Sequence, residues 1–222
     1  MIPIDDAVEQ ARAAGTDPMA PSLLFADPAD NPGGGGRGNT TYILAAFLKA
    51  GVHGCIAGVF FDPALVAQAQ RAGEGARFRA DLNTRESAQF SEPLSWDARV
   101  VHLHDGRFVG HHGMVEGKTV DLGPSAVIAL DGITLVAISK RQQCLSTDFF
   151  EALGVDVAGA RSVVVKSRGH FRAGFQHLFP PERIREVDVP GLTSPNLANF
   201  EWQGLPRPVF PLDPEARWTP PA

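Results

Sequence analysis

The sequence has little of several features that would narrow its class. It has only two cysteines, Cys55 and Cys144, and they are widely separated. This number and spacing predict neither a disulfide framework nor a zinc-binding motif. No apolar run approaches the roughly 18 residues of a membrane span, and residues 1–15 are acidic and helical in pattern, unlike a signal peptide. We therefore expect a cytoplasmic protein without a membrane partner.

Positive charge is also scarce. Lys and Arg number 20 against 25 for Asp and Glu, which gives a net charge of -5. Because non-specific nucleic-acid binding needs a basic face, no nucleic-acid partner is expected. The 222 residues, with 44% hydrophobic and 20% charged side chains, are typical of a soluble globular protein that buries a sizeable core. We expect a single domain.

Apolar periodicity and turn residues predict the secondary structure. Asp62 is expected to cap a helix with Pro63 at its first position, and Asp131-Gly132 is a strong hairpin signal. The predicted fold class is α/β to α+β, a mixed sheet with flanking helices and β-hairpins. Further helices are predicted over residues 4–14, 40–50, 147–153 and 170–179, and strands over 22–26, 54–61, 76–82, 94–103, 107–115, 119–122, 125–130, 133–139 and 163–166. Residues 1–20 form the N-terminal helix and lead-in, and residues 214–222 an irregular tail.

The 23 glycines and 18 prolines gather in two places, of which the loop Asp27–Gly38 is the more informative. Its glycines, including Gly33, Gly34 and Gly35, allow tight turns that aim several N–H groups at one point before a helix N-terminus. Asp30 and Asn31 could hold a polar ligand or satisfy the loop internally. A purely structural turn is the competing interpretation.

The same loop contains a dinucleotide-like pattern. Gly33, Gly35 and Gly38 fit G-x-G-x-x-G between a strand and a helix, with Asp62 about where a ribose-binding acid would lie. In that motif, however, the first glycine follows the strand directly, whereas here residues 27–32 intervene with two prolines. We keep dinucleotide binding as an alternative. No Gly-Lys-Ser/Thr follows, so a Walker loop is excluded.

A basic turn follows the apolar run Ser162–Val165. Lys166, Arg168, His170 and Arg172 place cationic or potentially cationic side chains at a predicted helix N-terminus, where they oppose the helix dipole. This predicts an anion or carboxylate partner, unless the charges are merely solvated and Ser167 caps the helix. A Ser167–His170 nucleophile pair lacks an acid and the right spacing. Because loops after neighbouring parallel strands converge, the turn and the glycine loop are predicted to share one face.

Four histidines lie close together in the sequence. If Asp105-Gly106 forms a hairpin turn, three of them share one sheet face, and His-x-His on a strand can bind zinc. No carboxylate partner is evident, so exposed hairpin histidines are the preferred interpretation. We expect the isolated chain to bind no stoichiometric zinc and to hydrolyse no peptide. The histidines are His102, His104, His111 and His112.

Together these motifs resemble the C-terminal domain of the MlrC (microcystinase C) family of metallopeptidases. The matching segments cover about residues 23–213. They are the loop Asp27-Pro28-Ala29-Asp30-Asn31-Pro32-Gly33-Gly34-Gly35 with Thr40-Thr41, Asp62-Pro63, Gly73-Glu74-Gly75, Leu122-Gly123-Pro124, the Lys166-Ser167…His170-Phe171-Arg172-Ala173 motif, Pro190-Gly191 and residues 207–213.

The resemblance implies a zinc-dependent amide or peptide hydrolase whose metal ligands belong to a separate N-terminal domain. We therefore expect no cofactor in this chain, and as partners that metal-binding domain, in cis or in trans, and a peptide or amide substrate. The expected substrate-binding or domain-interface residues are Asp27, Asp30, Asn31, Gly33, Gly34, Gly35, Lys166, Ser167, His170 and Arg172. A stand-alone module that binds an anionic small molecule or a dinucleotide is the second hypothesis.

Overall fold

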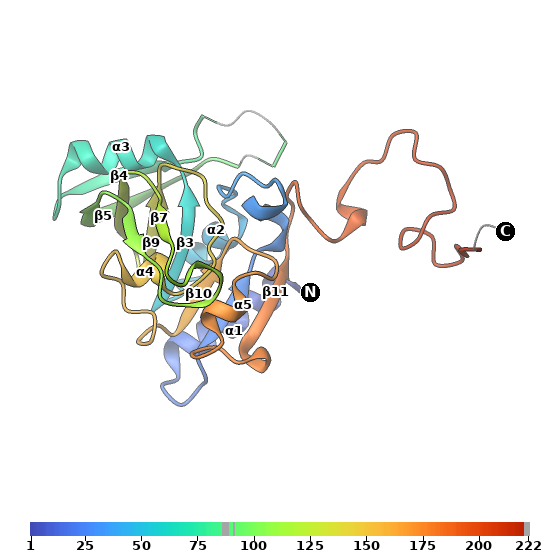
Figure 1. The fold of residues 1–222 in the computed structure, drawn as a ribbon, viewed down its shortest axis with the longest axis horizontal. Coiled ribbons are helices and arrows are strands. Elements are labelled where there is room, and N and C mark those ends of the chain that lie inside the picture. The colour runs from blue at the N-terminus through green and yellow to red at the C-terminus, as the bar shows by residue number, and fades with distance from the viewer. Residues whose placement is uncertain (86–88, 91, 220–222) are drawn as a thin grey trace.

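The core of the fold is a nine-stranded sheet, with strands in the order β1-β11-β2-β10-β3-β9-β8-β5-β4 (Figure 1). The computed structural model describes residues 1–85, 89–90 and 92–219. The strands of the sheet are β1 (Ile2–Pro3), β2 (Leu23–Ala26), β3 (Cys55–Phe61), β4 (Arg77–Leu82), β5 (Leu94–His104), β8 (Ser125–Leu130), β9 (Ile133–Ile138), β10 (Ser162–Val165) and β11 (Ile184–Asp188). A separate two-stranded sheet pairs β6 (Arg107–Val109) with β7 (Thr119–Asp121).

The large sheet has a parallel half and an antiparallel half. From β1 to β9 every neighbouring pair is parallel, whereas β9, β8, β5 and β4 pair antiparallel. The mixed sheet predicted from the sequence is therefore confirmed. Its parallel half is built from non-consecutive strands, so loops distant in the sequence emerge side by side at one edge.

Helices cover one face of the sheet, and shorter elements cover the other. The first face carries α1 (Ile4–Thr16), α2 (Tyr42–Lys49) and α3 (Pro63–Ala72), and the second carries α4 (Asp148–Glu151), α5 (Arg172–Phe175) and the β6–β7 pair. Strand β2 shows why both faces need cover, because Leu23 and Phe25 pack on one side while Leu24 and Ala26 pack on the other. The sheet is thus sandwiched at its centre.

Two local signals act as the sequence predicts. The Asp62 carboxylate accepts a hydrogen bond of 2.9 Å from the Leu65 N–H and caps α3. Asp131 and Gly132 both adopt positive φ angles and connect β8 to β9 as a hairpin.

The predicted hairpin around Asp105-Gly106 is wrong. Gly106 does turn the chain with a φ of 80°, but β5 pairs with β4 and β8 instead of β6. Strand β6 ends at Val109 and pairs with β7, so the predicted strand over residues 107–115 is also too long. Gly110 and Gly113 explain this early end, because the chain bends there into a 3-10 turn over Gly113–Val115.

Other expectations need correction at the C-terminal side. The predicted helix over residues 170–179 shortens to the four residues of α5, which contain the poor helix former Gly174. The helix over residues 147–153 shortens to α4, where Ser146 donates to the Asp148 carboxylate instead of capping. Strands β1 and β11, which pair with each other, were not predicted.

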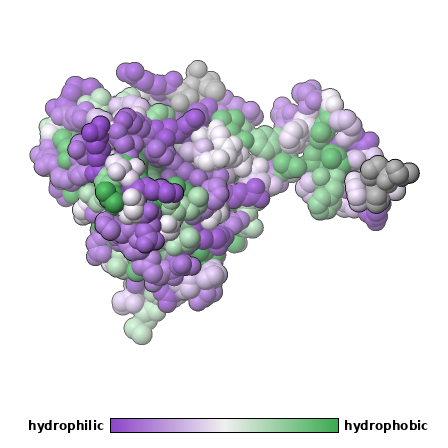
Figure 2. All heavy atoms as spheres, viewed as in Figure 1, coloured by the Kyte–Doolittle hydropathy of each residue, from purple (hydrophilic) through white to green (hydrophobic). Residues whose placement is uncertain are grey.

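The segment after β11 first packs on the glycine loop, where Thr193 Oγ1 accepts from the Asn31 N–H at 3.0 Å and donates to the Pro28 carbonyl at 2.8 Å. Its later part leaves the body of the fold, as Figure 1 shows. Within its described part, up to residue 219, the regular structure is a 3-10 turn at Leu197–Asn199; residues 220–222 of the predicted tail lie outside the described residues. Figure 2 shows hydrophobic residues gathered on this extended part. Four large apolar side chains of the segment are exposed: Leu192, Trp202, Phe210 and Trp218. Among the described residues, no helix combines the length and apolar character needed to cross a membrane.

Candidate functional site

The glycine loop and the basic turn meet at the carboxyl edge of the parallel strands. Strands β2 and β10 are paired, with Val165 opposite Ala26 at their ends. Asp27 directly follows β2, and Lys166 directly follows β10. The Asp27 N–H donates to the Val165 carbonyl at 2.8 Å. The predicted proximity of the two segments is therefore confirmed.

Lys166 is buried between two carboxylates of the loop. Its Nζ lies 3.0 Å from Asp27 Oδ2 and 2.9 Å from Asp30 Oδ2, and it donates to the Thr40 carbonyl at 2.7 Å. The lysine side chain is only 8% exposed and each carboxylate 2%, so solvent screens these charges little. We call Lys166, Asp27, Asp30 and Thr40 the Lys166 network. The carboxylate partner predicted for the basic turn is thus internal.

One positive charge in this network faces two carboxylates. Burial is the largest influence on Asp27 and raises its pKa. Burial also acts on Asp30, but the Lys166 charge and the Thr40 and Gly38 N–H donors outweigh it and hold the pKa of Asp30 below its usual value. Burial alone would lower the pKa of Lys166, yet the two aspartates outweigh burial and raise it. Asp30 is therefore the firmly ionised partner of the lysine.

The glycine loop satisfies its own backbone donors. Asp30 accepts from the N–H groups of Gly38 and Thr40, each at 2.7 Å, and the Asn31 side chain accepts from Gly33 at 3.0 Å. The other donors are also used, since Gly34 and Gly36 donate to the Asn31 carbonyl and Gly35 to the Pro32 carbonyl. N–H groups already bonded within the loop do not form an anion cradle. This geometry disfavours the phosphate-binding and dinucleotide interpretations.

Gln143 connects the open side of the loop to the basic turn. Its Nε2 donates to Ser167 Oγ at 2.8 Å, and its Oε1 lies 3.2 Å from His170 Nδ1. A Cβ atom on Gly33 would lie 2.2 Å from the same Oε1, so glycine permits this close packing. Sequence reasoning missed Gln143, because it belongs to the loop after β9 and to no recognised motif. We call exposed Gly33–Gly35, Gln143 and His170 the loop face.

One cation of the basic turn, Arg172, is engaged outside this face. Arg172 Nη2 donates to Glu186 Oε1 on β11 at 2.7 Å, and its guanidinium lies 5.4 Å from the Phe171 ring centroid. Arg168 is exposed. The predicted site residue Arg172 is therefore paired with β11.

The four histidines separate into two pairs, so the predicted common sheet face is wrong. His102 on β5 lies 2.8 Å from Glu74, and the His104 ring accepts from the Gly106 N–H at 2.9 Å. His111 and His112 lie elsewhere, each with Nδ1 3.3 Å from Asp148 Oδ1. The carboxylate that the sequence pattern lacked is thus present, 36 residues from His112.

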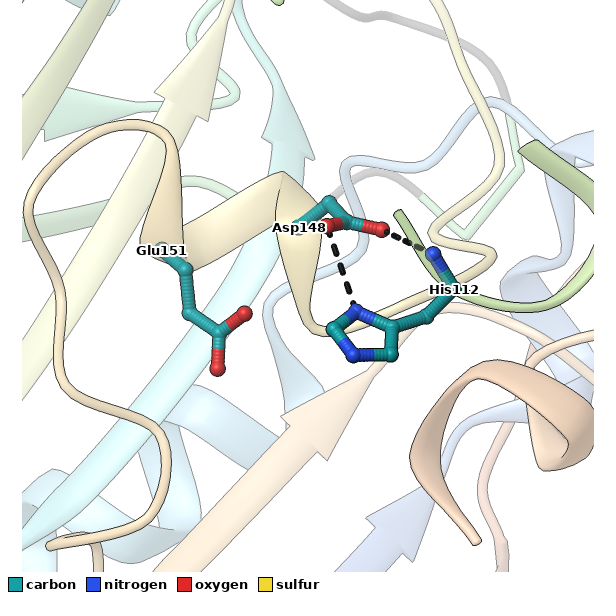
Figure 3. A group of neighbouring side chains, drawn as sticks. All are labelled: His112, Asp148 and Glu151. Carbon is teal, nitrogen blue, oxygen red and sulfur yellow. Dashed lines mark hydrogen bonds and ion pairs between the residues drawn. The ribbon is translucent and has the colours of Figure 1, made fainter. Parts of the chain in front are cut away.

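Asp148 and Glu151 complete a second group of polar side chains. Ligand atoms of His112, Asp148 and Glu151 all lie within 4.8 Å of one another, and Figure 3 shows the three side chains converging beside α4. Burial raises the pKa of Asp148, but hydrogen bonds from Ser146 and from the two histidines outweigh it and lower the pKa. We call His111, His112, Asp148 and Glu151 the His112 cluster.

Comparison with known proteins identifies the family of this chain. Residues 25–204 match the family model described as MlrC C-terminus. Microcystinase C from Sphingomonas sp. is 30% identical over 168 residues, which are 76% of this chain and 32% of that protein. The crystal structure of a Mesorhizobium sp. BNC1 protein named "Putative metallopeptidase" superposes with a TM-score of 0.77 at 28% identity, over 99% of this chain and 42% of that one. The chain thus spans less than half of either relative, and it belongs to the MlrC C-terminal family.

Proposed function

We propose that this chain is the C-terminal part of a zinc-dependent amide or peptide hydrolase of the MlrC type. In this proposal the metal ligands belong to an N-terminal domain, and the loop face docks on that domain or lines its substrate cleft. The relatives support the proposal, because one is named Microcystinase C and the other a metallopeptidase, and both are much longer than the matched region. The substrate would be a peptide or another amide.

The observation that carries the proposal is the rigid, internally satisfied glycine loop. Forming the Lys166 network costs the desolvation of three charged groups, which the pairing must offset. The ion pairs and the hydrogen bonds that Asp30 and Asn31 accept hold the exposed Gly33–Gly35 backbone beside Gln143 and His170. Preorganised backbone with adjacent polar side chains suits a cleft wall that must present one shape to a substrate or to another domain.

The C-terminal segment supports the proposal that another domain packs against this chain. Phe210 and Trp218 are 74% and 81% exposed, which is unfavourable for side chains of this size unless another surface covers them. The segment also has internal order, since the Asp213 carboxylate pairs with Arg207 and accepts from the Val209 N–H at 2.7 Å. An ordered apolar segment that leaves the body is typical of a strap that packs on a partner domain.

We place the protein in the cytoplasm. Cys55 and Cys144 are free and buried, and burial raises the pKa of Cys55 to about 12, so both thiols are unreactive core groups. Free thiols of this kind suit a reducing compartment.

A reconstitution experiment tests the proposal. The chain is co-expressed with the metal-binding N-terminal region of a full-length family member, and complex formation and zinc-dependent amide hydrolysis are measured. We expect a stable complex that hydrolyses amides, whereas this chain alone does not. The double variant Gln143→Ala/His170→Ala should weaken assembly or activity at least tenfold, as expected when central contacts are truncated.

The matched control is Arg79→Ala, which removes an exposed ion pair with Asp97 on the antiparallel half of the sheet. It should leave assembly and activity unchanged. Equal behaviour of the control and the double variant would show that the loop face does not take part. Amide hydrolysis by the chain alone would contradict the assignment of the metal chemistry to another domain.

A further inference from the structure

The His112 cluster lies on a rigid part of the second face of the sheet. Three backbone segments approach closely there: a Cβ atom on Gly113 would lie 2.8 Å from the Gly174 nitrogen, and one on Gly174 would lie 2.4 Å from the Leu145 carbonyl oxygen. These contacts pack the loop after β6, helix α5 and the segment before α4 against one another. His112 and Asp148 therefore keep a defined separation.

The two carboxylates lie at the two ends of the four-residue helix α4. Asp148 and Glu151 are three residues apart on α4, a spacing that places both side chains on the same helix face. Thr147 Oγ1 donates to Glu151 Oε2 at 3.0 Å, and Ser146 Oγ donates to Asp148 Oδ2 at 2.7 Å. The hydroxyls thus hold Asp148 Oδ2 and Glu151 Oε2, the second oxygen of each carboxylate group. Hydroxyl support of this kind surrounds metal-binding carboxylates.

The distances between the imidazole and carboxylate atoms are compatible with ligands of one metal ion as well as with hydrogen bonds. His111 Nδ1 and His112 Nδ1 each lie 3.3 Å from Asp148 Oδ1, which is long for an N–H···O contact, usually about 2.7–3.2 Å. Two ligands of a tetrahedral zinc with bonds of about 2.0–2.1 Å are separated by about 3.3–3.4 Å. The observed separations therefore match an edge of such a tetrahedron.

The ligand types narrow the class of metal. Imidazole nitrogen combined with carboxylate oxygen suits zinc and the neighbouring divalent transition metals, whereas calcium and magnesium prefer oxygen ligands alone. The His177 ring stacks on the His112 ring, with centroids 4.6 Å apart and planes 12° from parallel, which restricts the rotation of the His112 ring. Glu151 is exposed, and its carboxylate already lies within 4.8 Å of the ligand atoms of His112 and Asp148.

We infer that His112, Asp148 and Glu151 bind one divalent transition-metal ion, zinc or a close analogue. The ion would join the loop after β6 to α4. This inference does not depend on the proposed function, because it concerns metal binding by this chain alone. It also replaces the expectation of a metal-free chain, which assumed that no carboxylate lies beside the histidines.

Metal titration of the purified chain tests the inference. The chain is stripped with a chelator and titrated with Zn²⁺ in competition with a chromophoric chelator, and Co²⁺ absorption is recorded as a probe of geometry. We expect about one ion per chain and a tetrahedral Co²⁺ spectrum. Glu151→Gln and His112→Ala should each lower the affinity at least tenfold, and zinc should raise the Tm of the wild type more than that of Glu151→Gln.

His102→Ala is the matched control, because His102 also pairs with a carboxylate, Glu74, but lies on β5. It should leave the affinity unchanged. Circular dichroism confirms folding of each variant, and Glu151 is exposed, so its substitution should not perturb the core. Failure of the wild type to bind zinc, or zinc binding that survives Glu151→Gln and is lost in His102→Ala, would overturn the inference.

Discussion

The Lys166 network and the His112 cluster both join positive or titratable groups to carboxylates, yet their exposures differ sharply. Lys166 and its two aspartates are at most 8% exposed, whereas the His111 and His112 side chains are 76% and 39% exposed around a buried Asp148. A closed network can only support the shape of the loop above it. The exposed side chains of the His112 cluster are accessible to a ligand from solvent. Burial, more than residue type, therefore separates structural from ligand-binding charge groups here.

Breaking the Lys166 network should have the largest effect on the free energy of unfolding. Lys166→Met removes the cation and leaves Asp27 and Asp30 buried without their partner. Loss of one member of a buried ion pair typically costs about 3–5 kcal/mol. Urea unfolding followed by circular dichroism measures the loss. Arg168→Ala, in the same turn but exposed, is the control and should stay within about 0.5 kcal/mol; similar values for both variants would contradict the role given to Lys166.

Crowding the glycine loop should have the next largest effect. A Cβ atom on Gly36 would lie 2.7 Å from the Asn31 nitrogen and 2.8 Å from the Asp30 carbonyl carbon, both backbone atoms that cannot move freely. We expect Gly36→Ala to destabilise by about 1–3 kcal/mol. At Gly34 the nearest atom is 3.3 Å away in a side chain, so Gly34→Ala should change stability by less than about 1 kcal/mol. Thermal unfolding of the two variants gives the comparison.

The two aspartates of the network should differ from each other. Asp30 has a lowered pKa and accepts two backbone N–H groups, whereas burial raises the pKa of Asp27. Asp30→Asn should therefore cost about 1–2 kcal/mol more than Asp27→Asn at pH 7, since hydrogen bonds to a charged group contribute most. Chemical unfolding of both variants at pH 7 checks the order, and a larger loss for Asp27→Asn would contradict it.

Acid titration sharpens the same difference. Because the folded pKa of Asp30 is below its unfolded value of about 3.9, its stabilising contribution is present above that value and is lost as pH falls through the folded pKa. Asp27 has a raised pKa in the folded state, so the folded protein binds its proton more tightly than the unfolded chain does. Its contribution to the stability of the fold therefore becomes more favourable as pH falls. Asp30→Asn should thus flatten the acid limb of the stability profile, and Asp27→Asn should steepen it.

The smallest effect is expected in the open cluster. His111→Ala removes a side chain that is 76% exposed and makes only a long contact with Asp148. Without metal, the free energy of unfolding of this variant should differ from that of the wild type by less than about 0.5 kcal/mol. Thermal unfolding in a chelator measures this value. A loss above about 1 kcal/mol would mean that the open cluster is a structural element like the closed one.

Local sequence signals predicted those elements whose determinants lie within a few residues. The Asp62 cap and the Asp131-Gly132 turn formed as expected because each depends on its immediate neighbours. The family motifs likewise identified Asp27, Asp30 and Lys166, which the fold brings into direct contact although 139 residues separate Asp27 from Lys166.

The failures arose where pairing partners are distant in the sequence. Strand β11 has three charged residues among its five and no apolar alternation, so it resembles an exposed loop, but it pairs with β2, about 160 residues earlier. The Asp105-Gly106 turn was real, yet β5 found its partners in β4 and β8. Asp148 escaped notice for the same reason, because no local pattern links an acid on α4 to histidines on another loop.

The extended C-terminal segment has a consequence for optical measurements. Trp202 and Trp218, two of the three tryptophans in the sequence, belong to this segment, and they are 44% and 81% exposed. Their emission therefore reports mainly the water around the segment and little of the sheet, where Trp96 is the remaining fluorophore. Unfolding of the sheet should shift the emission maximum only slightly. Packing of the segment against another domain should instead shift the emission to shorter wavelengths, giving a label-free signal of assembly.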